Sequence, residues 1–159
     1  MGSNFSIAKS AVACKDNAIH LMVLATFAVA LMLPPAGQAA QPAGATENKV
    51  VFQVSDPDPK KWNLALNNVK NVQEAFGKDK VTVEVVVYGP GIGMLKMDSE
   101  AGNRVNDAVA NGVKIVACEN TMHGMKLTRK DMLDSISYVP GGVIELMDKQ
   151  KQGYAYIRP

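Results

Sequence analysis

The stretch VTVEVVVYG (81–89) is the most apolar of the strands that the sequence predicts. It has five valines within its first seven residues and little alternation between apolar and polar side chains. Valine favours the extended conformation, and a strand without alternation is typical of one that is buried on both faces, as in a parallel sheet. We therefore expect this segment to be an inner strand of a mainly parallel sheet.

Strands and helices alternate on both sides of this segment. KVVFQVS (49–55) is predicted as a strand, and Asp58 and Pro59 suit the cap and first turn of the helix after it. The other expected elements are a helix with an apolar stripe from Trp62 to Phe76 that ends at Gly77, a helix over 100–111, a strand over 113–120, a short helix from the Thr128/Asp131 capping box to about Ile136, a helix over 142–152 and a last strand over 154–159. This alternation predicts an α/β domain with four to five strands and with helices on both faces of the sheet.

The first forty residues do not resemble part of this domain. Lys9 and Lys15 precede an almost wholly apolar run, AIHLMVLATFAVALML (18–33), and small residues follow it. A basic start, an apolar run and a small-residue exit are typical of a secretory signal peptide, with cleavage after Ala39. The run is shorter than the roughly 20 residues of a spanning helix. We expect a signal peptide at 1–39, a flexible lead-in at 40–48 and one domain at 49–159, with a periplasmic or otherwise exported location after cleavage and no membrane contact.

Charge and cysteine content narrow the function classes. The chain has 17 basic and 15 acidic residues, and cleavage would leave 15 and 14, a formal charge of +1. Nucleic-acid binding usually requires a concentrated basic surface, so no nucleic-acid partner is predicted. Cleavage would also remove Cys14, which leaves Cys118 without a partner for an internal disulfide. Such a cysteine is buried, paired between chains, or a free thiol with a function.

Three segments are expected at the carboxyl edge of the sheet, where ligands of open α/β sheets bind. They are 55–57 with Asp56, 88–93 with Gly89, Gly91 and Gly93, and 118–121. The glycines permit positive φ and a close approach of the backbone. Their spacing is not that of a dinucleotide-binding loop, and they indicate either a tight turn or an anion-binding nest.

The segment CENTMHGM (118–125) holds the candidate functional residues. Cys118 ends the apolar run of its strand, and a helix starting near Thr121 would favour its thiolate through unpaired N–H groups. Asn120 and Thr121 could hydrogen-bond the sulfur or order the turn, and His123 is a further candidate helper. The alternative is a buried, inert thiol, because cysteine is among the most buried residue types.

Four segments together resemble the DsrE/DsrF-like proteins, and in particular their small, uncharacterised single-domain branch. They are the Gly-Pro-Gly loop at 89–91, GVKIVACENTM (112–122), VPGGVIEL (139–146) and QGYAYIRP (152–159). The resemblance implies a flavodoxin-like three-layer domain and homo-oligomers, often trimers or hexamers. It also implies a sulfur carrier or transferase, without a cofactor, that holds sulfur as a persulfide on a cysteine after a central strand, and Cys118 matches that cysteine. Small sulfur compounds or a partner thiol protein would then be the partners. The relay members are cytoplasmic, so the export signal departs from their pattern.

Two other functions are consistent with the residues. Thiolate, thioether and imidazole suit Cu(I), so Cys118, Met122 and His123 could bind copper in the periplasm, although no spacing matches a recognised metal motif. A non-catalytic oligomeric module that binds a ligand is the other alternative.

Overall fold

The computed structural model describes residues 48–159, and these residues form one five-stranded parallel sheet. The strand order is β4-β3-β2-β1-β5. The strands are β1 (Asn48–Val54), β2 (Val81–Val87), β3 (Lys114–Cys118), β4 (Ser137–Val139) and β5 (Ala155–Ile157). The prediction of an α/β domain with a parallel sheet is confirmed. The predicted signal peptide at 1–39 and most of the lead-in at 40–48 lie outside the described residues, and β1 begins at Asn48.

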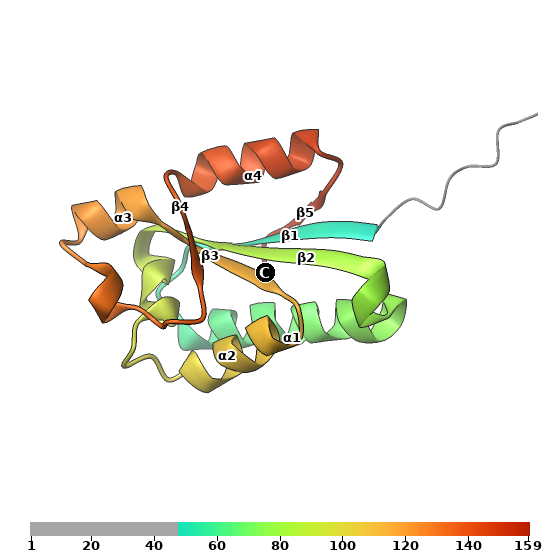
Figure 1. Ribbon diagram of the computed structural model, residues 1–159, viewed down its shortest axis with the longest axis horizontal. Helices are drawn as coiled ribbons and strands as arrows, with labels where there is room; N and C mark the ends of the chain where they lie inside the picture. Colours follow the sequence, from blue (N-terminus) through green and yellow to red (C-terminus); the bar gives the residue numbers. More distant parts are fainter. Residues whose placement is uncertain (1–47) are drawn as a thin grey trace, which may run out of the picture. The chain divides into compact units, whose positions relative to one another are not determined.

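Helices cover both faces of the sheet (Figure 1). The helices α1 and α2 pack on one face, α4 covers the other, and α3 lies at the end of β3. Their bounds are α1 (Pro59–Phe76), α2 (Gly102–Ala110), α3 (Glu119–Gly124) and α4 (Gly142–Lys151), with 3-10 helices η1 (Lys78–Lys80), η2 (Gly89–Leu95) and η3 (Arg129–Asp131). Within residues 48–159, no helix is both long and apolar enough to cross a membrane.

The strand β2 lies between β1 and β3 and is buried on both faces, as its valine content predicted. Because successive side chains of a strand point to opposite faces, its residues divide between two cores. Val83, Val85 and Val87 belong to the larger core beneath α1 and α2. Val86 belongs to the smaller core beneath α4, whose other members are Val51, Val116, Val139 and Leu146.

The start of α1 has the predicted cap. Asp58 precedes the helix, and its Oδ1 accepts the Lys60 N–H at 2.9 Å. The indole N–H of buried Trp62 donates to the Asp56 carbonyl at 2.7 Å, which anchors the first turn to the end of β1. Phe76, the last residue of the predicted apolar stripe, is half-exposed in the last turn, where it lines a hollow together with Val72 and Val50.

The predicted helix from Thr128 to Ile136 is wrong. The capping box is present, with the Thr128 N–H and hydroxyl both donating to Asp131 Oδ2, but only the short η3 follows it. The backbone then pairs with the end of η2 instead of continuing as a helix, since Met132 bridges Lys96 and the Leu133 N–H donates to Leu95 O at 2.9 Å. The next residues form β4, a short strand at the sheet edge that the sequence pattern did not reveal.

Candidate functional site

The three segments expected at the carboxyl edge of the sheet are joined there by hydrogen bonds. The Tyr88 N–H donates to Val54 O and the Gly91 N–H to Ser55 O, each at 3.1 Å, which ties the start of η2 to the end of β1. The Gly89 N–H donates to Thr121 Oγ1 at 2.9 Å, which ties the same loop to α3. The loop after β2 therefore links the end of β1 to the region of Cys118.

The loop glycines are required by close packing. Gly89 has a φ of +54°, and a side chain at Gly91 would place its Cβ 2.7 Å from Val54 O. A Cβ at Gly93 would approach the Trp62 ring to 3.3 Å. The N–H groups of Gly89 and Gly91 are hydrogen-bonded within the protein, so the structure favours a tight turn over an anion-binding nest at these positions.

Cys118 is the last residue of β3 and the residue before the first turn of α3. Its side chain is 5% exposed. Its Sγ accepts the Gly142 N–H at 3.2 Å, a bond across the sheet edge to the first residue of α4, and the Pro140 carbonyl lies at 4.0 Å. The thiol is thus buried, but its nearest partners are polar groups.

These polar groups decide the ionisation of Cys118. Burial by itself raises the pKa of the thiol, because it disfavours the thiolate. The Thr121 hydroxyl, the Gly142 N–H that is bonded to Sγ, and the nearby N–H groups of Thr121 and Asn120 outweigh that effect, and the pKa lies below its ordinary value of 9.0. The site therefore favours the nucleophilic form of cysteine.

The first turn of α4 covers Cys118. A Cβ at Gly142 would lie 2.9 Å from the Tyr88 Cβ, so only glycine permits this approach of α4 to the end of β2. A Cβ at the preceding Gly141 would lie 3.7 Å from Asn120 Nδ2 and 3.4 Å from Ile144 Cγ1. Gly141, Asn120 and Ile144 therefore lie close together, next to the glycine whose N–H reaches the sulfur.

The remaining predicted residues divide between this site and other parts of the fold. Asn120 and Thr121 surround Cys118, and His123 is exposed in the last turn of α3. Met122 is buried in the core beneath α1 and α2 and does not join the thiol's contacts. Asp56 is engaged at the end of β1, where its Oδ2 pairs with Lys61 at 3.4 Å and Arg158 at 3.5 Å. In residues 48–159, no group of three or more His, Cys, Asp or Glu side chains is arranged to hold a metal ion.

Sequence reasoning missed two residues, one in α4 and one that contacts it. Gly142 was not predicted as a partner of Cys118, although the glycine pair in VPGGV was a signal for a close approach. Glu84 was not singled out either, although it is the one charged residue within the valine-rich strand β2. It is almost fully buried and bonds to α4 through Lys149.

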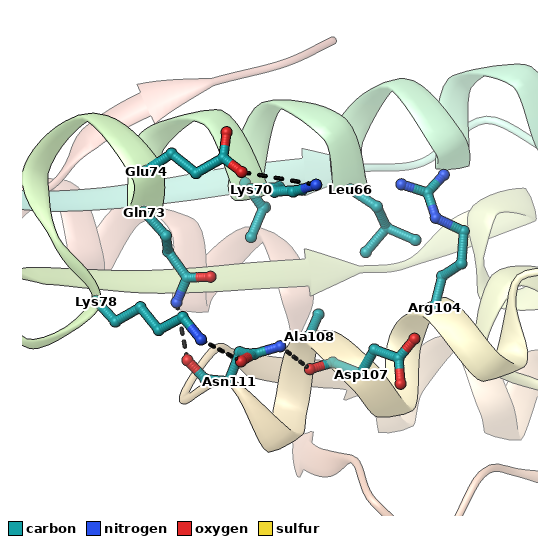
Figure 2. Close-up of a pocket in the computed structure, with 10 residues that line it drawn as sticks. Leu66, Lys70, Gln73, Glu74, Lys78, Arg104, Asp107, Ala108 and Asn111 are labelled. Atoms are coloured by element: carbon teal, nitrogen blue, oxygen red, sulfur yellow. Dashed lines mark hydrogen bonds and ion pairs between the residues drawn. The ribbon is translucent and has the colours of Figure 1, made fainter.

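A hollow in the described region lies away from Cys118. It has a volume of about 470 Å³ and lies between α1 and α2, on the face of the sheet opposite α4. Figure 2 shows its apolar floor with Leu66 and its mixed rim, where Lys70 pairs with Glu74 at 3.6 Å and Lys78 bonds to Asn111 at 2.5 Å.

Comparison with known proteins agrees with this fold. A solved protein of unknown function from Methanobacterium thermoautotrophicum is 33% identical, with a TM-score of 0.68, over 70% of this chain and 99% of the other. A conserved protein of unknown function from Bacteroides thetaiotaomicron is 15% identical (TM-score 0.58; 74% and 100% covered). The ychN protein from E. coli is 10% identical (TM-score 0.57; 71% and 99% covered). The last two likenesses show the fold alone.

No curated protein matches the chain. The model of the DsrE/DsrF-like family matches residues 48–159, which is the whole of the described domain. The chain therefore belongs to the DsrE/DsrF-like family.

Proposed function

We propose that the protein carries sulfane sulfur as a persulfide on Cys118. The family suggests a role similar to sulfur relay, and the chemistry of such a role requires a cysteine that is ionised near neutral pH. The observation that carries the proposal is the Gly142 N–H, which donates to the Cys118 sulfur at 3.2 Å and, with the Thr121 hydroxyl, lowers the pKa of the thiol despite burial. A thiol with a purely packing role needs no such donors.

The transfer needs no cofactor and no net oxidation. The Cys118 thiolate attacks the terminal sulfur of a donor persulfide, R–S–SH. A bond forms between Sγ and that sulfur, the donor S–S bond breaks, and R–S⁻ leaves and takes up a proton. An acceptor thiolate then attacks the terminal sulfur of Cys118–S–SH, which regenerates the Cys118 thiolate. The N–H groups around Sγ stabilise this thiolate each time it leaves.

Access to the buried sulfur is part of the proposal. Gly141 lies between Pro140 and Gly142, which both contact the sulfur, and it presents no side chain there. We expect a small sulfur compound, or a thiol on a partner protein, to approach beside Gly141 and Asn120. The copper alternative has less support, because Met122 is buried in the core beneath α1 and α2.

Intact mass spectrometry tests the proposal directly. The reduced full-length chain is incubated with inorganic polysulfide, desalted and weighed, and we expect a gain of one sulfur atom that dithiothreitol removes. Cys118→Ser should not gain sulfur, whereas the matched variant Cys14→Ser should gain it as the wild type does. Sulfur loading that persists in Cys118→Ser, or a wild type that gains none where a known persulfide carrier does, refutes the proposal.

We also propose that the domain self-associates through the outer face of α4. Val143, Ile144 and Met147 are exposed there, and Ile144 is 61% exposed. Exposed apolar patches of this kind mark interaction sites, and the family resemblance makes a second copy the expected occupant, as a trimer or hexamer. Light scattering coupled to size-exclusion chromatography should show a smaller species for Ile144→Asp. The control Met97→Asp, at a 66% exposed position after η2, should leave the mass unchanged.

We also propose that residues 1–39 direct the export of the protein and are then removed. If the apolar run directs secretion, the protein recovered from the exported fraction should begin at Ala40. N-terminal sequencing of that fraction tests this, and an exported or retained chain that still begins at Met1 contradicts cleavage.

A further inference from the structure

The inner face of α4 carries a line of residues that contact the sheet. Gly142, Leu146 and Lys149 recur at spacings of four and three, which places them on one side of the helix. Gly142 bonds to Cys118, and Leu146 is buried against the valines of the smaller core. Lys149 bonds to Glu84 of β2. The thiol site and Glu84 are therefore linked through one helix.

Glu84 lies at the centre of a cluster of four charges. Its Oε2 lies 2.9 Å from Lys149 Nζ and 3.2 Å from Lys114 Nζ. Glu145, on the same helix as Lys149, approaches Lys149 Nζ at 3.5 Å and Lys114 Nζ at 3.8 Å. Two carboxylates and two ammonium groups from β2, β3 and α4 thus join at one place.

The contact between Glu84 and Lys149 is buried. The Glu84 side chain is 2% exposed and the Lys149 side chain 13% exposed. Burial raises the pKa of Glu84, and Glu145 adds to the rise while the two lysines oppose it. Burial alone would lower the pKa of Lys149, but its bond to Glu84 outweighs this effect and raises it. Breaking a buried pair of this kind by removing one partner leaves an uncompensated charge and shifts the elements that the pair joins.

The cluster lies at the opposite end of α4 from the thiol. Glu84 is in register with Lys114, four residues before Cys118 on β3, which is about 13 Å along a strand. Gly142 and Lys149 are seven residues apart, which is about 10 Å along a helix. The helix thus spans β3 from its carboxyl end to its start, and it is attached to the sheet at both ends.

We propose that Glu84 is a positioning residue for Cys118, because its bond to Lys149 seats α4 so that the Gly142 N–H stays on the sulfur. This inference rests on the proposed function only in that it takes Cys118 as the reactive thiol. Gly142 sits against Tyr88 with no room for a Cβ, so a small lift of α4 suffices to lengthen its bond to the sulfur. Glu84 itself does not touch Cys118 and is not a catalytic residue.

A direct effect of charge would have the opposite sign. The groups that face Glu84 are Lys114 from β3 and Glu145 and Lys149 from α4. Next to the thiol, Glu119 pairs with Arg129 at 2.8 Å. Removing the negative charge of Glu84 leaves the lysines in excess, which would lower the pKa of the Cys118 thiol. Loss of positioning would raise that pKa, because the thiolate loses a hydrogen bond.

The test is the pH dependence of alkylation. The rate at which iodoacetamide modifies Cys118 is measured against pH in the Cys14→Ser chain, and the midpoint gives the pKa of the thiol. In Glu84→Gln we expect the midpoint to rise by about one pH unit. Amide exchange at Gly142, followed by hydrogen–deuterium exchange, should become faster in the same variant.

Two further variants make the result decisive. Glu84→Asp keeps the charge, but its shorter side chain does not reach Lys149, so its alkylation midpoint should also rise. This variant replaces Glu84→Gln in the test if Glu84→Gln does not fold. Asp148→Asn removes a negative charge from the same helix at an exposed pair with Lys151, and its midpoint should match the parent. An unchanged or lower midpoint in both Glu84 variants overturns the inference and leaves the proposed function standing. A parent thiol with an ordinary pKa overturns both.

Discussion

Replacing Thr121 with valine should raise the pKa of Cys118 by about one unit. The Thr121 hydroxyl accepts the Gly89 N–H at 2.9 Å, and its hydrogen bonding to the thiol is the largest effect that lowers the pKa of Cys118. A hydroxyl has one donor and two acceptor sites, so it can make both bonds at once. Valine has a similar shape but can make neither, and the thiolate loses its one side-chain donor.

The size of the shift follows from the hydrogen bond that is lost. A hydrogen bond to a charged group contributes about 1.5–3 kcal/mol, and one pKa unit corresponds to about 1.4 kcal/mol. Complete loss would therefore raise the pKa by about one to two units. The backbone donors of Gly142, Thr121 and Asn120 remain and recover part of this. We accordingly expect a shift at the lower end of that range.

The assay should report the midpoint of alkylation against pH, because the rate at one pH understates the effect. Below both midpoints, a rise of one unit lowers the thiolate fraction about tenfold. The more basic thiolate is intrinsically about threefold more reactive, so the observed rate falls only about threefold. Thr121→Ser keeps the hydroxyl and should retain the parent midpoint. A midpoint in Thr121→Val that is unchanged or lower would show that the hydroxyl does not stabilise the thiolate.

The remaining predictions concern stability and packing. The pKa of Cys118 is lower in the folded chain than in the unfolded one. The thiolate's contribution to the free energy of unfolding is therefore absent below the folded pKa, grows as pH rises through it and is complete above 9.0. Urea unfolding from neutral to alkaline pH should show the wild type gaining stability relative to Cys118→Ser, and a constant difference would contradict this. Gly142→Ala should lower the free energy of unfolding by about 1–3 kcal/mol and raise the pKa of Cys118, because the new Cβ meets Tyr88 at 2.9 Å. In the control Gly124→Ala the new Cβ meets no atom within 4 Å, so thermal unfolding should be unchanged. Asp58→Ala should lower the unfolding free energy by about 1 kcal/mol through loss of the helix cap, and equal midpoints of thermal unfolding would refute that cost.

Local chemistry explains why much of the fold could be predicted. The valines of β2 require burial on both faces, and Asp58, Pro59 and Gly77 define the ends of α1 by cap geometry that operates within a few residues. These features depend on neighbours in the chain, so the sequence alone was enough to predict them. The boundary after β3 was less exact, because the strand ends at Cys118 instead of 120 and α3 begins at Glu119, two residues before Thr121.

The sequence-based predictions of secondary structure fail where distant segments compete for the same backbone groups. Thr128 and Asp131 form the predicted capping box, but pairing with Lys96 and Leu95 ends the turn. The short β4 exists only because β3 offers it an edge.

The amino-acid sequence by itself determined the α/β class, the parallel sheet and the position of Cys118 at the sheet's carboxyl edge, because these follow from burial periodicity and chain order. Only the tertiary structure decided what surrounds the sulfur. Gly142 is 24 residues from Cys118 along the chain, and Glu84 lies on another strand. Both contact α4 or belong to it, because that helix crosses back over the sheet. The ionisation of the thiol therefore depends on both levels: Thr121 and Asn120 follow it directly in the chain, whereas the Gly142 N–H reaches the sulfur only through the tertiary fold.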